Sequence, residues 1–332
     1  MNKIEFPRTS YDGTRLTKES LEEWFLDKLS KNIHDKLIKR KEFTVLKNEF
    51  KIDPNKEQIW DCIINHLDDI LLASPRRLRT YTRCVDRFYS HLFFYINSRG
   101  RKASTDFGKE ILNAFNYETY RQNVLVELAR KLDVKACPYC NMHYTLFAEE
   151  YTNKRTKNLA KFQFDHFFDK VEYPLLSMSL YNLIPSCAVC NNAKTTKNLS
   201  LNFHPYHSAI CEQFHFEVEK PLDLYYAALV KKDNINIKIV EDDCKKDELD
   251  DFIDMFKIQS LYSRHKDIAQ ETFDKAYEEP YYLNPANFSF LSDKSPEYLE
   301  RLWMGTYTSL DEIERRPMTK FIQDLWKQAK GT

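Results

Sequence analysis

Two CxxC pairs constrain this 332-residue chain more than any other feature of its sequence. Cys137 and Cys140 form one pair, Cys187 and Cys190 form the other, and residues 141–186 lie between them. Four thiolates in this arrangement are typical of two short knuckles that close around one tetrahedral Zn²⁺ ion. A four-cysteine site leaves no coordination position open for a water molecule, so its zinc is structural and any catalysis must use other residues.

The remaining cysteines stand alone in the sequence, and burial is the expected reason for each of them: Cys62, Cys84, Cys211 and Cys244. The N-terminus lacks the basic-then-apolar pattern of a signal peptide, and no segment approaches the ~18 apolar residues that cross a bilayer. We therefore expect a cytoplasmic protein with no membrane partner. Structural disulfides are not expected in that reducing compartment.

The chain contains only 5 glycines, and none lies between Gly108 and Gly305. A Walker A loop or a glycine-rich dinucleotide fingerprint is therefore excluded from that stretch. The 50 basic and 50 acidic residues cancel, which argues against indiscriminate binding driven by net charge. The cancellation hides an asymmetry, because residues 1–210 carry 33 basic against 25 acidic side chains and residues 211–332 carry 17 against 25.

The hydrophobic pattern divides the chain into three parts. Apolar residues at spacings of three and four predict an α-helical domain over residues 1–130. One of its helices has Leu21, Trp24, Phe25 and Leu29 at this spacing, and another extends over 59–72. Alternating residues over 213–219 and 234–240 predict a small sheet, an acidic tract follows at 241–254, and helical periodicity returns from Phe252. Residues 211–332 are therefore expected to form a C-terminal α+β domain, in a protein that is α+β and mainly helical.

One predicted helix of the N-terminal domain is strongly basic. Four arginines fall within a narrow angular sector of it: Arg76, Arg79, Arg83 and Arg87. Asp86 is the only acid between residues 76 and 102. Two interpretations stay open, a ridge that binds phosphate groups of a nucleic acid and a solvated helix face that happens to be basic.

The segment between the cysteine pairs carries the polar residues best suited to chemistry. Alternation around Phe164 predicts a strand that ends near Asp165 and His166, and Asn182 follows among apolar residues. Ser186 after Pro185 can begin a helix, on which Cys190, Asn191 and Lys194 share one face. The expected frame is a strand, a loop and a helix next to a zinc knuckle.

This segment resembles the HNH endonucleases. The resemblance covers residues 137–206 and rests on these stretches: CPYCN at 137–141, DHF at 165–167, YPLL at 173–176, YNLIPSC at 181–187, CN at 190–191 and HPY at 204–206. It implies that residues 131–210 form a ββα-metal nuclease core, inserted between the other two parts and stapled by zinc.

The resemblance also implies a role for each polar residue. His166 would be the general base that activates water, Asn182 would orient it, and Asp165 and Asn191 would bind one catalytic Mg²⁺ or Mn²⁺ ion. Asn191 stands where many family members have histidine. Lys194 and His204 would contact phosphate or complete the site.

The expected activity is metal-dependent hydrolysis of DNA phosphodiester bonds. The likeness to large bacterial HNH proteins further suggests an antiviral defence effector, paired with an ATPase or another sensor subunit. A different class stays open, in which the chain is a zinc-stabilised nucleic-acid-binding or scaffold protein with a vestigial nuclease core.

Overall fold

The fold is known from a computed structural model, which describes residues 3–47, 53–152, 155–160, 162–219, 235–242, 245–284, 287 and 293–331. Contacts divide the chain into two compact units. One unit comprises residues 4–133 and 146–201, and the other comprises 1–3, 134–145 and 202–332. Residues 131–210, expected as one domain, contribute to both units, and the division into three domains stays a prediction.

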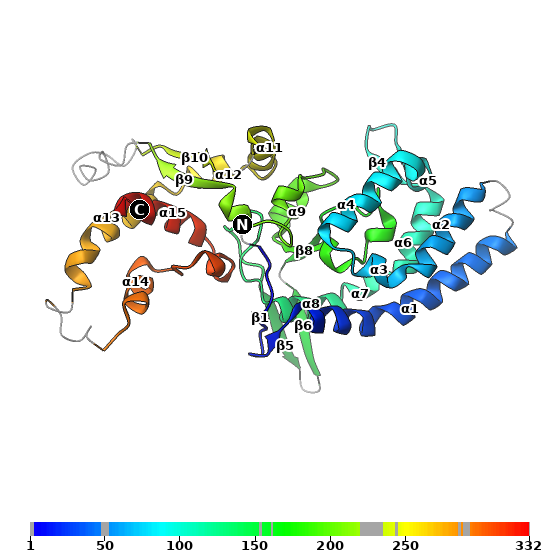
Figure 1. Cartoon of the computed structure of the whole chain (residues 1–332), viewed down its shortest axis with the longest axis horizontal. Helices are drawn as coiled ribbons and strands as arrows, with labels where there is room; N and C mark the ends of the chain where they lie inside the picture. The colour runs from blue at the N-terminus through cyan, green and yellow to red at the C-terminus, as the bar shows by residue number, and fades with distance from the viewer. Residues whose placement is uncertain are drawn as a thin grey trace. The chain divides into compact units, whose positions relative to one another are not determined.

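The first unit is built mainly of short helices (Figure 1). They are α1 (Lys18–Leu46), α2 (Pro54–Asn65), α3 (Leu67–Leu71), α4 (Pro75–Cys84), the π-helical turn η2 (Val85–Tyr89), α5 (Ser90–Phe93), α6 (Asp106–Phe115), α7 (Tyr117–Tyr120) and α8 (Val124–Leu132). The long helix α1 buries Leu21, Phe25 and Leu29 as its periodicity predicts, whereas Trp24 is only half-buried. This helix contacts α2, α3 and α6. The helix expected over 59–72 is divided in two at His66 and stops before Ser74, which caps α4.

Each sheet of this unit is a pair of antiparallel strands. The pairs are β1 (Arg8–Thr9) with β2 (Arg15–Leu16), β3 (Phe94–Ile96) with β4 (Lys102–Ser104), β5 (Phe147–Thr152) with β6 (Arg155–Ala160), and β7 (Gln163–His166) with β8 (Leu183–Ser186). Two 3-10 turns, η3 (Pro174–Leu176) and η4 (Leu180–Asn182), lie between β7 and β8, and α9 (Ala188–Lys194) follows β8. The sequence pattern predicts a strand, a loop and a helix here, and the structure adds the strand β8 between the loop and the helix. Ser186, expected to begin the helix, is the last residue of β8, and Cys187 caps α9 instead.

The second unit packs helices against one antiparallel pair of strands. Its elements include β9 (Phe214–Val218), β10 (Ile237–Glu241), α11 (Lys246–Phe256), α12 (Ile258–Tyr262), α13 (Lys266–Tyr282), α14 (Pro296–Met304), η9 (Leu310–Arg315) and α15 (Thr319–Lys330). The two predicted strands are confirmed as β9 and β10, although residue 234 lies outside the described residues. Residues 243 and 244 of the acidic tract also lie outside them, and much of the remaining tract forms α11.

The core of this second unit is aromatic. The Phe216 ring lies 4.4 Å from the Tyr262 ring and 5.2 Å from the Phe321 ring, centroid to centroid, so β9, α12 and α15 share one cluster. The protein is thus mainly α-helical, with small two-stranded sheets, as expected. Within the described residues, no helix has the length and apolar character needed to span a bilayer.

The glycine in the first turn of α6 generates a prediction about stability. A Cβ atom at Gly108 would stand 2.3 Å from the carbonyl oxygen of Phe93, which also accepts a hydrogen bond from Thr105 N at 2.9 Å. Alanine normally stabilises a helix relative to glycine by about 1 kcal/mol. Because of this contact, we expect Gly108→Ala to lower the free energy of unfolding by about 1–3 kcal/mol in urea denaturation. Lys109→Ala, at the next and exposed position, should change it by less than about 0.5 kcal/mol, and a stabilised Gly108→Ala protein would contradict the packing described.

Candidate functional site

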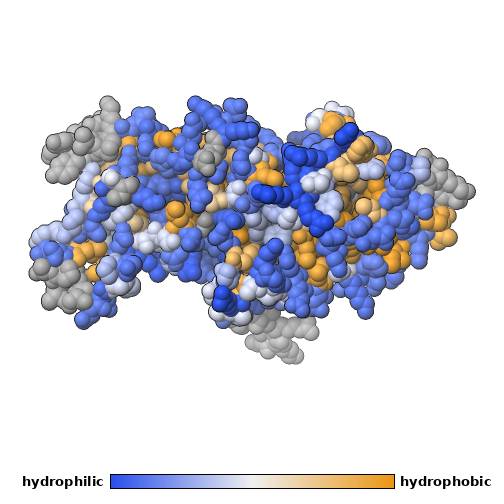
Figure 2. Space-filling view, viewed as in Figure 1, coloured by the Kyte–Doolittle hydropathy of each residue, from blue (hydrophilic) through white to orange (hydrophobic). Residues whose placement is uncertain are grey.

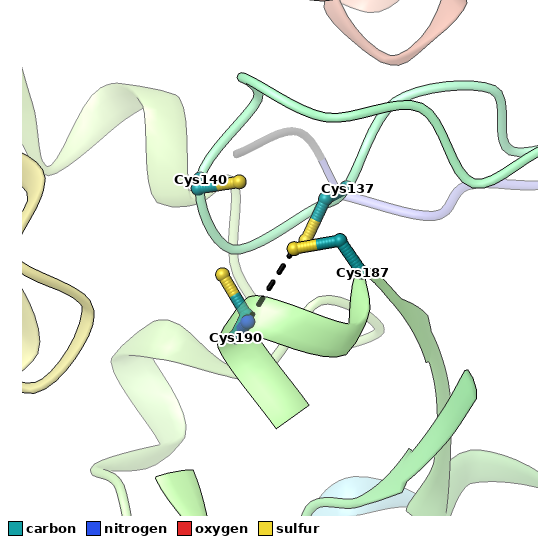
Figure 3. A group of neighbouring side chains, drawn as sticks. All are labelled: Cys137, Cys140, Cys187 and Cys190. Atoms are coloured by element: carbon teal, nitrogen blue, oxygen red, sulfur yellow. Dashed lines mark hydrogen bonds between the residues drawn. The ribbon is translucent and has the colours of Figure 1, made fainter. Parts of the chain in front are cut away.

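The four paired cysteines come together as the sequence predicts. All four are buried, and their Sγ atoms lie within 4.8 Å of one another. Figure 3 shows the side chains of Cys137 and Cys187 pointing toward each other, with the Cys190 side chain beside them on α9. Four thiols in such a cluster could bind one metal ion, such as zinc.

Backbone N–H groups point at two of these sulfur atoms. Met142 N donates to Cys140 Sγ at 3.4 Å, and Cys190 N donates to Cys187 Sγ at 3.4 Å, the bond drawn in Figure 3. His143 Nδ1 lies 3.6 Å from Cys140 Sγ. Donors of this kind stabilise thiolates and orient metal ligands, so the environment of the sulfur atoms suits a thiolate metal site.

Asn141 fixes the turn that follows Cys140. Its φ of 50° lies in the left-handed region, which asparagine tolerates better than most residues. Its fully buried amide donates to Ile313 O at 2.8 Å and accepts from Lys320 N at 3.1 Å, while its backbone carbonyl accepts from Met318 N at 2.6 Å. The knuckle is therefore held by backbone groups that lie far away in the sequence.

The strand–strand–helix segment brings three predicted residues together. Asp165 lies on β7 opposite Ile184 of β8, and α9 contacts β7. Lys194 Nζ of α9 lies 3.2 Å from the Asp165 carboxylate, and Asn191 donates to Gln163 Oε1 one turn earlier. Asp165, Asn191 and Lys194 thus occupy one interface between a strand and a helix.

Lys194 is buried rather than presented to solvent. Its side chain has 0% exposure and that of Asp165 has 3%. The ammonium also donates to the backbone carbonyl of His166 at 2.7 Å. Both charges are removed from water and compensate each other, whereas a contact between Lys194 and phosphate stays a prediction.

His166 is held as a neutral imidazole. Nε2 lies 2.9 Å from Ser177 O, and because a carbonyl oxygen can only accept, this bond places the proton on Nε2. Burial, with the charge of Lys170 next in size, lowers the pKa of His166 to about 3. Nδ1 is then unprotonated at neutral pH, and no other described residue hydrogen-bonds to it.

The side-chain hydrogen bonds of Asn182 go to backbone groups and not to the ring that it was expected to orient. Its buried amide accepts from Phe168 N at 2.8 Å and donates to Phe168 O at 3.0 Å and to Leu176 O at 2.9 Å. These bonds hold the backbone that follows His166 and the turn that precedes Ser177. The orientation of the imidazole comes directly from Ser177 O, and Asn182 acts on it through the loop.

The other predicted residues belong to other elements of the chain. His204 belongs to the second unit, where it is buried and its Nδ1 accepts a hydrogen bond from Tyr206 N at 3.2 Å. Arg76, Arg83 and Arg87 are exposed on α4 and η2, and Arg79 is half-buried. None of these four arginines forms an ion pair with a carboxylate of the described residues.

Sequence reasoning missed three residues of this region. Gln163 could have been found, because it lies two positions before Asp165 on a strand and therefore faces the same helix. The only sign of Asn141 in the sequence is its place in the CPYCN stretch, and nothing in the sequence marks Ser177 as the partner of His166.

Comparisons with known proteins add nothing to this geometry: no family model matches the chain, and no curated protein or solved structure gives a match.

The cysteine cluster predicts a metal content. Protein purified without added metal should contain about one zinc ion per chain by atomic emission spectroscopy. Cys187→Ser should lose that metal and unfold at a lower temperature, since structural zinc contributes directly to folding free energy. Among the unpaired cysteines, the expected burial is confirmed for Cys211 and is wrong for Cys62 and Cys84, which are exposed. Cys84→Ser therefore serves as the control and should keep the metal. Folded wild-type protein with a zinc content near zero would rule the site out.

The buried ion pair between Lys194 and Asp165 predicts that the stability losses of single and double variants are not additive. Lys194→Met leaves the Asp165 carboxylate buried without its cation, so the free energy of unfolding should fall by about 3–5 kcal/mol in urea denaturation. Combining it with Asp165→Asn should cost less than the two single changes summed, because the partners interact. Lys197→Met, at an exposed lysine nearby, serves as the control. Additive losses would show that the two charges do not stabilise each other.

Proposed function

We propose that this protein is a metal-dependent DNA endonuclease of the HNH type. One observation carries the proposal: a neutral histidine with its proton fixed on Nε2 follows a carboxylate at the end of a strand, and the helix that packs on this strand places Lys194 at that carboxylate and the Asn191 amide at the neighbouring Gln163. The motif order over residues 137–206 supports the same conclusion.

His166 would act as the general base. Its Nδ1 would accept a proton from a water molecule while the water oxygen attacks phosphorus and the bond from phosphorus to the leaving oxygen breaks. The leaving oxygen takes a proton from solvent. Ser177 O keeps the other ring nitrogen protonated, so a single tautomer is ready to accept, and Asn182 keeps that loop in place.

Asp165 and Asn191 would hold one Mg²⁺ or Mn²⁺ ion. The donors fit such an ion, because carboxylate and amide oxygens are hard ligands and both residues lie at the contact between β7 and α9. The ion would stabilise charge on the phosphate and on the leaving oxygen. Lys194 already lies at the Asp165 carboxylate, so it would share that group with the ion.

The four-cysteine cluster would hold a structural Zn²⁺ ion and take no part in hydrolysis. Arg76, Arg79, Arg83 and Arg87 would bind the phosphate backbone of DNA, and His204 would add a phosphate contact. We further propose a cytoplasmic, antiviral effector whose activity depends on an ATPase or another sensor subunit. This last part rests on the resemblance alone.

A zinc-stabilised DNA-binding or scaffold protein is the second candidate. The Asp165–Lys194 pair favours it, because a lysine beside the carboxylate lowers the attraction of that site for a divalent cation. In that case the strand–strand–helix segment would be a structural remnant of a nuclease.

Plasmid nicking separates the two candidates. With Mg²⁺ or Mn²⁺, wild-type protein should relax supercoiled plasmid, and His166→Ala should reduce the rate by about 10²–10⁴-fold because the general base is lost. His34→Ala, on α1, should cleave like the wild type, and thermal unfolding checks that each variant is folded. Equal rates for wild type and His166→Ala would contradict the assignment of the base, and absence of nicking by wild-type protein with every metal would favour the scaffold.

A further inference from the structure

Residues 75–104 combine free positive charge with exposed aromatic rings. Asp86 is the only acid among them, and its carboxylate accepts a hydrogen bond from Tyr173 OH at 2.8 Å. Phe88 is 55% exposed and Tyr95 is 53% exposed, although aromatic side chains are usually covered. We call the following six residues the basic–aromatic surface: Arg76, Arg83, Arg87, Phe88, Tyr95 and Arg99.

The helical part of this surface has one charged face. Leu78 and Thr82 bury the opposite side of α4, and Val85 continues the buried side into η2. Arg87 places its guanidinium 5.1 Å from the centroid of the Phe88 ring. In Figure 2 the most hydrophilic colour gathers over α4.

The hairpin of β3 and β4 supplies the second ring. Tyr95 pairs with Ala103, whose small side chain leaves the ring uncovered on the strand pair. At the tip, Gly100 has a φ of 67° and the Asn97 side chain accepts hydrogen bonds from the backbone of Arg99 and Arg101. The tip is therefore an ordered turn whose two arginine side chains are exposed.

The same segment is attached to the loop that orients His166. Tyr173 bonds to Asp86 and α4 contacts η4, while Ser179 Oγ of the same loop donates at 2.6 Å to Ile70 O of α3, the helix that precedes α4. Ser177, which fixes the His166 tautomer, lies between these two anchors in the sequence. Surface and candidate site thus belong to one unit and share one support.

We propose that the basic–aromatic surface binds unpaired DNA and delivers it to the candidate site. The guanidiniums match the phosphate charges, which explains why they lack carboxylate partners among the described residues. The rings can stack only on bases whose faces are accessible, and in a duplex the neighbouring base pairs cover those faces. The choice of DNA rests on the proposed function, whereas the preference for single strands rests on the exposed rings.

Binding without cleavage tests this proposal separately from catalysis. Fluorescence anisotropy is measured with labelled oligothymidine of about 20 nucleotides and with a DNA hairpin duplex of the same length, in buffer without added divalent ion. Phe88→Ala and Tyr95→Ala should each weaken single-strand binding by about 5-fold or more and leave duplex binding within about 2-fold. Phe88→Tyr keeps the ring and should keep the affinity. Tyr298→Ala removes an exposed ring of the other unit and should have no effect.

The arginines should act on both ligands. Arg83→Gln should weaken both complexes and lower the slope of log K against log salt by about 0.7 for the single strand. Equal loss of single-strand and duplex affinity in Phe88→Ala, or no loss in either ring variant, would overturn the proposal. Tighter binding of oligouridine RNA than of oligothymidine would overturn DNA as the occupant. Because no step requires hydrolysis, a protein that fails to nick plasmid can still pass this test.

Discussion

The burial of one lysine against one carboxylate determines how the segment over residues 163–194 can pack. Lys194 is fully buried and Asp165 nearly so, so each charge needs the other. The ammonium also donates a hydrogen bond to the His166 carbonyl. This requirement fixes α9 along β7 at a single position. Cys190 and Asn191 lie on the same face of α9 as Lys194, so the ion pair between Lys194 and Asp165 positions them as well.

The parts of the fold that the sequence predicts are those governed by short-range patterns. The buried face of α1 follows from a spacing of three and four, and β9 and β10 follow from alternation. The cysteine cluster was also predictable, since two CxxC pairs in one chain are typical of a site that holds a common metal ion. In each case the types of the residues and their spacing are enough to predict the structure.

Other features depend on partners that leave no mark in the sequence. His166 bonds to the backbone of Ser177, and any residue at that position would offer the same carbonyl. Asn182 likewise bonds only to backbone groups, so its type suggested an active-site amide while its position makes it a brace for the loop. Lysine is seldom buried, so the sequence does not show that Lys194 pairs with Asp165, and only the distance between the two side chains reveals the pairing.

The bonds made by Asn141 have a consequence for how the protein is made. The turn after Cys140 is completed by backbone groups of residues 313–320, and Lys135 and Ala136 both donate to Glu314 O. On a growing chain, all four cysteines leave the ribosome well before those partners exist. The turn after Cys140 therefore acquires its final shape only after about 120 further residues have been synthesised beyond Cys190. A chain whose synthesis stops in that interval contains all four thiols but lacks the backbone groups of residues 313–320 that hold this turn.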